Sequence, residues 1–337
     1  MGFHISKTQF NTWLTQQQKK YNIYAPIRYA GGNTFSDVDC IRYGIVNDIS
    51  DIVFDKKSEY SFKEVLTPIS QILFFFTEDQ CKESAPPAKG AVIFLRSCDL
   101  HALKRLDDIY LKNGAPDYYY TRIRDNIKIV LMGCDNSFEN CFCVSMETNN
   151  ADNYDMSIDL TDDGYDIDCK HDEWERLFMD MKASRRSVMP NRVHTNTVSV
   201  HIPDDLTADV ARSSRWEAYT KRCIGCGRCN FVCPTCTCFT MQDLYYNENA
   251  KVGERRRVWA SCMVDGFTDV AGGGSYRKNN GDRMRFKVLH KVLDHKQRNG
   301  YHMCVGCGRC DDICPEYISF SHCVNKLDDA MREVTKA

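Results

Sequence analysis

The sequence has no long apolar run. Its longest apolar stretches, at residues 72–76 and 91–95, have the length of a single strand. A helix that spans a bilayer needs roughly 18 to 20 apolar residues in succession. Residues 1–20 also lack the apolar centre of a secretory signal. We therefore expect no membrane-spanning segment and no export, and hence a cytoplasmic location.

The sequence also has no excess of charge of either sign. The 44 Lys and Arg residues are balanced by 46 Asp and Glu, which leaves a net charge of −2. A nucleic-acid-binding protein usually shows a strongly basic surface, so no nucleic-acid partner is expected. Glycine-rich dinucleotide motifs, phosphate-binding loops and nucleophile motifs are missing as well. The chain is therefore not expected to bind flavin or nicotinamide, or to contain catalytic residues.

Cysteine, by contrast, is abundant, with 19 residues among 337. In a reducing compartment, clustered thiols are metal ligands or catalytic groups more often than disulfides. Eight of these cysteines form two tight groups of four, and four more fall between positions 98 and 143. The distribution therefore favours metal centres.

The N-terminal half has the pattern of an α/β domain. A buried strand is predicted at 91–97 and a second at 127–133. Between them, Asp99 is predicted to cap a helix whose apolar positions recur at helical spacing, namely Leu100, Leu103, Leu106 and Tyr110. Strand, helix and strand over about forty residues have the size of a right-handed βαβ unit.

Other elements are expected around this unit. An amphipathic helix should lie within residues 1–20, where Ser6 and Gln9 suit a capping box and Phe10, Trp13 and Leu14 form the apolar side. Strands are predicted at 69–76 and 198–202, a hairpin at 159–168, and helices at 171–181 and 283–295. The basic residues of the last helix could offset the charge of negative metal centres or face a partner, although a solvated face is expected for any single one of them.

Two copies of the pattern C-x2-C-x2-C-x3-C-P stand in the C-terminal part. They consist of Cys223, Cys226, Cys229 and Cys233, and of Cys304, Cys307, Cys310 and Cys314. This spacing is typical of two-cluster ferredoxins, in which the fourth cysteine of each motif ligates the other [4Fe–4S] cluster. We therefore assign Cys223, Cys226, Cys229 and Cys314 to one cluster, and Cys304, Cys307, Cys310 and Cys233 to the other. Structural zinc is the alternative, but zinc sites usually pair two distant C-x2-C hooks.

These motifs define the expected domain organisation. Residues 1–210 should form the α/β domain, and residues 211–337 an α-helical, ferredoxin-like domain with two [4Fe–4S] clusters. Such a domain normally has about sixty residues, yet about seventy separate the two motifs here. We therefore expect a long insertion at about residues 240–300.

A third cluster is predicted in the α/β domain. Cys98 follows the first strand of the βαβ unit and Cys134 follows the second, so both should lie at the carboxyl edge of the sheet. Cys141 and Cys143 stand in the loop after Cys134, and this loop can fold back over the same edge. Four thiols are the number that a cubane needs. The alternatives are four small buried hydrophobic residues or a zinc site.

The other seven cysteines give weaker signals. Cys236, Cys238 and Cys262 should lie beside a cluster, with no role that the sequence assigns. Cys40, Cys81, Cys169 and Cys323 have no partner at ligand spacing and are expected to be structural.

Several segments together resemble a family of electron-transfer subunits. Residues 95–103 (LRSCDLHAL) resemble the family signature R-x-C-D-x-x-A-L, with Ser97 in place of a common proline. Cys134 with residues 141–143 (CFC), residues 233–239 (CPTCTCF) and residues 259–263 (WASCM) match in the same order. The family contains the A subunits of anaerobic sulfite reductases and the β subunits of cytoplasmic sulfhydrogenases, and the resemblance extends from about residue 61 to 323. Chain length and the residues around the motifs favour the sulfite reductase subunit.

The resemblance implies a non-catalytic relay within an oxidoreductase complex. Electrons would enter from a partner subunit with flavin and NADH and leave to a sirohaem subunit that reduces sulfite to sulfide. One alternative is the same role in an NAD(P)-linked nickel–iron hydrogenase. The other, from a different class, is a non-redox protein whose metal sites only hold the fold together.

Overall fold

The structure is a computed structural model and describes residues 1–33 and 37–336. The chain divides into two compact units. The first contains residues 1–67, 85–138 and 147–196, and the second contains residues 68–84, 139–146 and 197–337. This division differs from the single boundary expected near residue 210, because two short segments of the N-terminal half fold with the C-terminal part.

Within the described residues, the first unit is built on a sheet of eight strands. In pairing order they are β10 (Ser184–Arg185), β1 (Gly2–Ile5), β9 (Tyr165–Cys169), β8 (Met156–Leu160), β7 (Ile127–Met132), β6 (Gly90–Arg96), β2 (Tyr21–Tyr29) and β3 (Cys40–Ile45). The central strands β2, β6, β7 and β8 are parallel, and the outer pairs are antiparallel. The hairpin expected at 159–168 corresponds to β8 and β9.

Helix α3 (Ser97–Tyr110) and the short α4 (Tyr118–Arg124) connect β6 to the parallel β7. The predicted cap at Asp99 is wrong, since α3 begins at Ser97 and follows β6 directly. Asp99 is fully buried in the first turn of the helix, where a carboxylate is favoured by the helix dipole. The earlier start places Cys98 within this first turn rather than in a loop.

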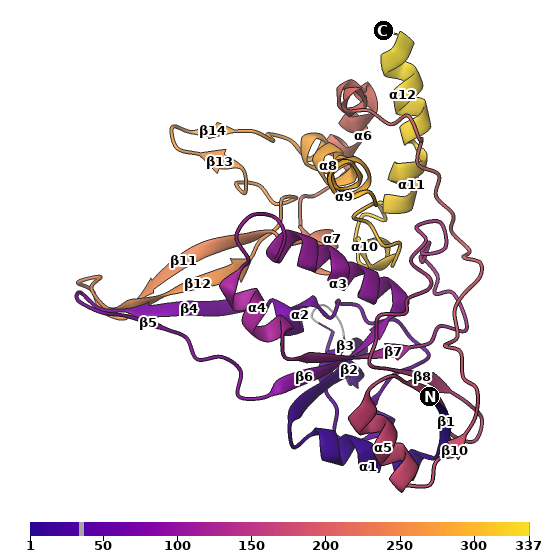
Figure 1. The fold of residues 1–337 in the computed structure, drawn as a ribbon. Helices are drawn as coiled ribbons and strands as arrows, with labels where there is room; N and C mark the ends of the chain where they lie inside the picture. Colours follow the sequence, from indigo (N-terminus) through magenta and orange to yellow (C-terminus); the bar gives the residue numbers. More distant parts are fainter. Residues whose placement is uncertain (34–36, 337) are drawn as a thin grey trace. The chain divides into compact units, whose positions relative to one another are not determined.

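The opposite face of the sheet is covered by α1 (Lys7–Gln17) and α5 (Asp172–Asp180), as Figure 1 shows. Ser6 and Gln9 form the predicted capping box. Trp13 of α1 packs edge to face against Trp174 of α5, with the ring centroids 5.0 Å apart. The remaining elements of the unit are α2 (Lys63–Leu66) and a 3-10 turn, η1 (Ile49–Asp51).

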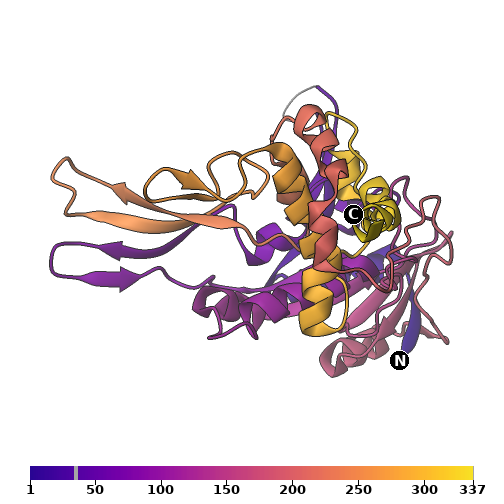
Figure 2. The same cartoon turned by 90° about the horizontal axis from the view of Figure 1, so that it is seen from above.

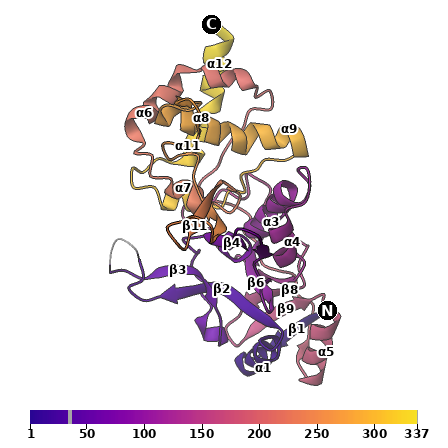
Figure 3. The same ribbon diagram turned by 90° about the vertical axis from the view of Figure 1, so that its left-hand side faces the viewer.

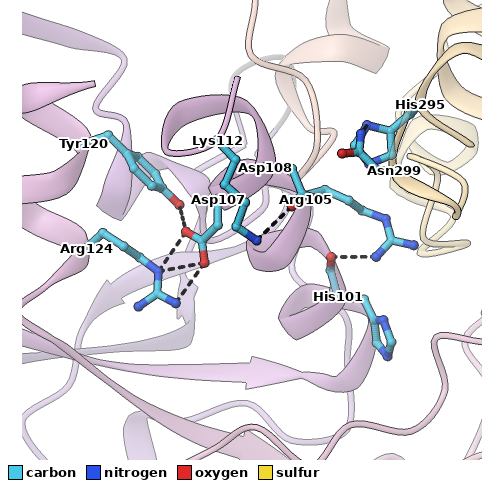
Figure 4. Close-up of polar contacts among 9 residues, drawn as sticks. All are labelled: His101, Arg105, Asp107, Asp108, Lys112, Tyr120, Arg124, His295 and Asn299. Carbon is cyan, nitrogen blue, oxygen red and sulfur yellow. Dashed lines mark hydrogen bonds and ion pairs between the residues drawn. The ribbon is translucent and has the colours of Figure 1, made fainter. Parts of the chain in front are cut away.

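An ion pair fixes α4 to α3 (Figure 4). Arg124 donates from Nε and Nη2 to the carboxylate of Asp107 at 2.9 Å each, and the Tyr120 hydroxyl donates to the same carboxylate at 2.8 Å. All three side chains are largely buried, so the bidentate geometry compensates for their desolvation. This network stabilises the crossover that carries the chain from β6 to β7.

The second unit contains a four-stranded antiparallel sheet with the order β11 (Phe239–Tyr245), β12 (Gly253–Trp259), β4 (Ser70–Phe76) and β5 (Cys81–Glu83). The strand expected at 69–76 therefore pairs with residues of the expected insertion. Figure 2 shows these strands as a long, narrow ribbon. Strands β13 (Asp269–Val270) and β14 (Gly274–Ser275) form a separate small hairpin.

Helices make up the rest of the second unit, and several are visible in Figure 3. They are α6 (Glu217–Arg222), α7 (Arg228–Phe231), α8 (Asn280–Leu289), α9 (His295–Asn299), α10 (Arg309–Asp312), α11 (Phe320–Asn325) and α12 (Leu327–Lys336). A π-helical turn, His290–Asp294, joins α8 to α9, and 3-10 turns lie at Ala208–Arg212 and Ser214–Trp216. The strand predicted at 198–202 is wrong, because this segment has no regular structure. In the ranges that the structure describes, no helix is long and apolar enough to cross a membrane.

Candidate metal centres

The first cysteine motif forms a loop that leads into α7. Gly225 and Gly227 have φ angles of 68° and 75°, a left-handed conformation that glycine adopts without steric cost. Gly227 is the N-cap of α7. The backbone N–H of Gly225 points to the Cys223 Sγ at 3.4 Å. The loop therefore turns its thiols and a backbone donor toward the same side, as a cluster requires.

The second motif repeats this geometry at the start of α10. Gly306 and Gly308 have φ angles of 65° and 69°, and Gly308 is the N-cap of α10. The N–H of Gly306 points to the Cys304 Sγ at 3.4 Å. The Ile318 N–H reaches the Cys314 Sγ at 3.3 Å. Such N–H to sulfur contacts stabilise thiolates and tune the potential of a bound cluster.

Two cavities lie between these loops. The first is lined by all four thiols expected to hold one cluster, Cys223, Cys226, Cys229 and Cys314, and also by Cys310. The second is lined by the other expected set, Cys233, Cys304, Cys307 and Cys310, and also by Cys229. Each cavity thus combines three thiols of one motif with the last two thiols of the other motif. Two apolar walls, Met263 with Met284 and Phe142 with Phe320, complete the first and second cavities.

Two buried lysines accompany the thiols. Lys287 lines both cavities and Lys291 lines the second, and their exposed fractions are only 5% and 3%. The Lys291 Nζ donates to the carbonyl and hydroxyl oxygens of Thr235 at 3.0 and 2.7 Å. Burying an ammonium group costs several kcal/mol unless negative charge lies close by. The lysines therefore fit a strongly anionic group in the cavities.

The pKa values of Lys287 and Cys304 reflect the competition between burial and the charge of neighbouring groups. Burial lowers the pKa of Lys287, but the neighbouring Cys229 and Cys310 thiolates outweigh burial and raise it well above its ordinary value. Burial raises the pKa of the Cys304 thiol to about 12. At neutral pH this thiol is therefore protonated until iron replaces the proton, so metal binding releases protons.

The sequence did not single out these two lysines, because any one basic residue of the helix at 283–295 was expected to be solvated, with compensation of the charge of the clusters as the alternative. A signal for their burial was present, however. Lys287 and Lys291 are four residues apart, and Met284 and Val288 occupy the same spacing on the buried side of the helix. Positions four residues apart share one helix face, so the two lysines follow the apolar stripe.

The thiols predicted to hold a third cluster fall into two pairs, one in each unit. Cys98 and Cys134 belong to the first unit, directly after β6 and β7. The buried Arg96 donates from Nη1 to the Cys134 Sγ at 3.2 Å and to the Gly133 carbonyl at 3.0 Å. Its guanidinium also lies over the Phe138 ring at 4.7 Å. Arg96 thus orients the Cys134 loop, a role that sequence reasoning missed.

Cys141 and Cys143 belong to the second unit, in residues 139–146. Both are buried. The Cys141 Sγ lies 3.5 Å from the Cys307 carbonyl oxygen, and the Phe142 N–H donates to the Gly306 carbonyl at 2.8 Å. The segment that carries this pair therefore packs on the second cysteine loop. A common site for all four thiols stays a prediction.

The three cysteines without an assigned role lie close to the first loop. Cys262 accepts a hydrogen bond from Asn230 Nδ2 at 3.1 Å and contacts Cys238, and Cys236 contacts Cys233. Cys40, Cys169 and Cys323 are buried and Cys81 is exposed. Across residues 1–33 and 37–336, no three His, Cys, Asp or Glu side chains are placed to hold a single metal ion.

Comparison with known proteins identifies the class first. The model of the 4Fe–4S dicluster domain family matches residues 222–318. This range contains both cysteine motifs and the segment between them. The chain is therefore an iron–sulfur protein with a dicluster domain.

A relative then extends the likeness to nearly the whole chain. The β subunit of sulfhydrogenase 2 from Pyrococcus furiosus is 29% identical over 331 residues, which cover 92% of each chain. No solved structure matches. The chain is thus an iron–sulfur electron-transfer protein that is related to a sulfhydrogenase β subunit.

Proposed function

We propose that this chain is the electron-relay subunit of an oxidoreductase complex of the sulfhydrogenase kind. The observation that carries the proposal is the pair of adjoining cavities. Each is lined by four thiols of the expected sets, and Lys287 lies between them. Bound [4Fe–4S] clusters would supply one-electron transfer, and their proximity suits passage from one to the other. The relative's name, a β subunit, supports a complex with partner subunits.

In this role the residues of the chain have distinct tasks. The cysteine thiolates hold the two centres, and Cys98, Cys134, Cys141 and Cys143 are proposed to hold a third. The N–H groups of Gly225 and Gly306 and the ammonium groups of Lys287 and Lys291 stabilise the negative charge that each electron adds. Met263 and Met284 line the first cavity, and Phe142 and Phe320 the second, with apolar side chains. No residue is assigned to the chemistry on the final substrate, which we place in a partner subunit.

The second candidate is the same relay in an anaerobic sulfite reductase. The signatures at 95–103, 141–143 and 233–239 are common to both groups, and the specific observation in favour of the sulfite reductase is that the residues around them resemble those of its A subunits. In that case a flavin and NADH subunit would supply electrons and a sirohaem subunit would use them. The likeness over 92% of the sulfhydrogenase subunit favours the hydrogenase reading.

Purification of the tagged chain with its partners under anaerobic conditions tests the proposal. We expect a brown complex whose absorbance near about 400 nm bleaches on addition of dithionite. A nickel–iron partner identifies the hydrogenase relay, and a sirohaem partner identifies the sulfite reductase relay. Cys226→Ser or Cys307→Ser should abolish NAD(P)H-linked turnover. Artificial-donor turnover by the catalytic partner should persist, because that route bypasses the relay. A colourless chain without iron would contradict both candidates.

A further inference from the structure

The two cysteine loops have the same pattern but opposite exposure. Ile224 and Cys226 of the first loop correspond in motif position to Val305 and Cys307 of the second. Ile224 is 61% exposed and Cys226 is exposed, whereas Val305 and Cys307 are only 2% and 7% exposed. The backbone does not explain this difference, because the loop glycines have φ angles of 68° and 75° in one and 65° and 69° in the other.

Residues 139–146 explain the burial of the second loop. The Phe142 N–H donates to the Gly306 carbonyl at 2.8 Å, and Asn140 Nδ2 donates to Asp312 at 2.8 Å. A Cβ atom on Gly308 would lie 2.2 Å from the Asn140 carbonyl oxygen, so the two backbones are in direct contact. Phe142 also lines the second cavity. The chain itself therefore covers the second loop on the side that the first loop leaves open.

Exposed side chains border the first cavity. Its lining includes Ile224 and Pro315 as well as the exposed Cys226, together with the charged Arg228 and Glu316. Tyr317, two residues after Pro315, is 89% exposed and has a φ of 50°. A non-glycine residue in this left-handed region costs roughly 1–2 kcal/mol, which the surrounding structure must compensate. The turn thus presents an aromatic ring to solvent directly after Pro315 and Glu316, which line the same cavity as the exposed thiol.

We infer that a cluster held in the Cys223 cavity would exchange electrons with an external redox protein, while a cluster held in the Cys304 cavity would exchange them with the third centre proposed at Cys141 and Cys143. The inference rests on the proposed function and adds an order to it. The external partner, the Cys223 cavity, the Cys304 cavity and the centre at Cys141 and Cys143 would then follow one another along the path. The partner that fits is a redox protein with a largely apolar contact surface, because Ile224 and Tyr317 are exposed and uncharged, and because Arg228 and Glu316, which also line the cavity, carry opposite charges.

The first experiment measures the access of solvent to each centre. The full-length, cluster-loaded chain is reduced with dithionite, and its electron paramagnetic resonance signals are assigned with Cys226→Ser and Cys307→Ser, which alter one cavity each. A neutral gadolinium chelate is then added as a soluble relaxing probe. We expect the signal altered by Cys226→Ser to relax several-fold faster with the chelate than the signal altered by Cys307→Ser. An equal or larger response of the Cys307 signal would overturn the inference.

The second experiment asks whether a partner covers this face. In the complex purified with a tagged chain, the chelate should accelerate the relaxation of the Cys226 signal no more than it accelerates that of the Cys307 signal. The double variant Ile224→Lys with Tyr317→Lys should keep its iron but bind the co-purifying subunits about tenfold more weakly. Tyr118→Lys, at a tyrosine of the first unit that is 54% exposed, is the matched control. Unchanged binding by the double variant would overturn the assignment of the face.

The proposed function and the inferred order of the centres can be refuted separately. If no [4Fe–4S] signal forms in the loaded chain, the proposed function fails and the inference fails with it. If both signals form and take up electrons but the Cys307 signal is the accessible one, the relay stands and only the order is wrong.

Discussion

The Phe142 amide and the Gly306 carbonyl are joined by a hydrogen bond with N and O 2.8 Å apart. This bond ties a segment of the N-terminal half of the sequence to the second cysteine loop. A Cβ atom at Gly306 would lie 2.6 Å from the carbonyl carbon and oxygen of Phe142. At Gly225, the corresponding position in the first loop, the nearest atom would be the Asn280 side-chain oxygen at 3.1 Å.

Gly306→Ala should therefore be more damaging than Gly225→Ala. Both positions have positive φ, so each substitution costs roughly 1–2 kcal/mol from backbone strain. Gly306→Ala adds a steric clash with backbone, worth about 1–3 kcal/mol more. We expect a lower thermal midpoint and loss of the second centre for Gly306→Ala alone, measured by melting curves and iron analysis. Equal effects at both glycines would contradict the role of segment 139–146.

The third centre can be counted directly. Three cubanes predict about twelve irons and twelve labile sulfides per chain after anaerobic reconstitution. Cys98→Ala should reduce both numbers to about eight, since a cubane with three thiolates is easily lost. Cys40→Ala, at a buried cysteine outside the predicted sites, should retain about twelve. Eight irons in the natural chain, or no loss in Cys98→Ala, would exclude the third centre.

Cross-ligation predicts a reciprocal pattern. Cys233 lines the cavity of Cys304, and Cys314 lines the cavity of Cys223. Cys233→Ala should therefore alter the resonance signal assigned through Cys307→Ser, and Cys314→Ala should alter the signal assigned through Cys226→Ser. Each variant should spare the other signal. The opposite pairing would show that each motif supplies all four ligands to its own cluster.

Removal of a buried cation should make reduction harder. Lys287 is 5% exposed and lines both cavities, so its positive charge favours the more negative, reduced state of a cluster. Lys287→Met should shift the midpoint potentials to more negative values by tens of millivolts, on the order of 50 mV. A redox titration measures the shift. Lys296→Met, at an exposed position of α9, is the control and should leave the potentials unchanged.

Asp159 predicts a pH dependence in the first unit. Burial raises the pKa of this carboxyl to about 6, compared with about 3.9 in an unfolded chain. Below about pH 4 the carboxyl is protonated in both states, and the stability that it contributes is lost as the pH rises through about 6. Asp159→Asn should therefore stabilise the chain above pH 6, by about 2–3 kcal/mol at most, and not at pH 4.

Denaturant unfolding at pH 4 and pH 7.5 measures this difference. The side-chain amide of the Asp159→Asn variant would keep an acceptor for the Asn191 N–H, which now lies 3.2 Å from an Asp159 oxygen. Asp163→Asn, at a carboxylate that is 82% exposed, should have little effect at either pH. A stabilisation that is equal at both pH values would rule out ionisation as its cause.

Much of the local structure follows from sequence pattern alone. The capping box of Ser6 and Gln9 starts a helix because both partners lie within one turn. The spacing of the two cysteine motifs likewise determines their loops, since the intervening glycines permit the turns and the thiols are only three residues apart. Sequence pattern places the start of α3 three residues too late, because burial rather than capping decides the position of Asp99.

The features that distinguish the two cavities depend on residues far apart in the chain. The sequence by itself determined the two four-cysteine motifs and their loops, because the cysteines of each motif lie within about eleven residues of one another. Only the tertiary structure decided that Lys287 and Lys291 face the thiols, and that residues 139–146 cover the loop at 304–310 while the loop at 223–229 stays open. The physical reason is that the loop at 304–310 is buried by a segment more than 150 residues away in the chain. The two loops have the same local sequence pattern, so that pattern does not predict which of them a distant segment will contact.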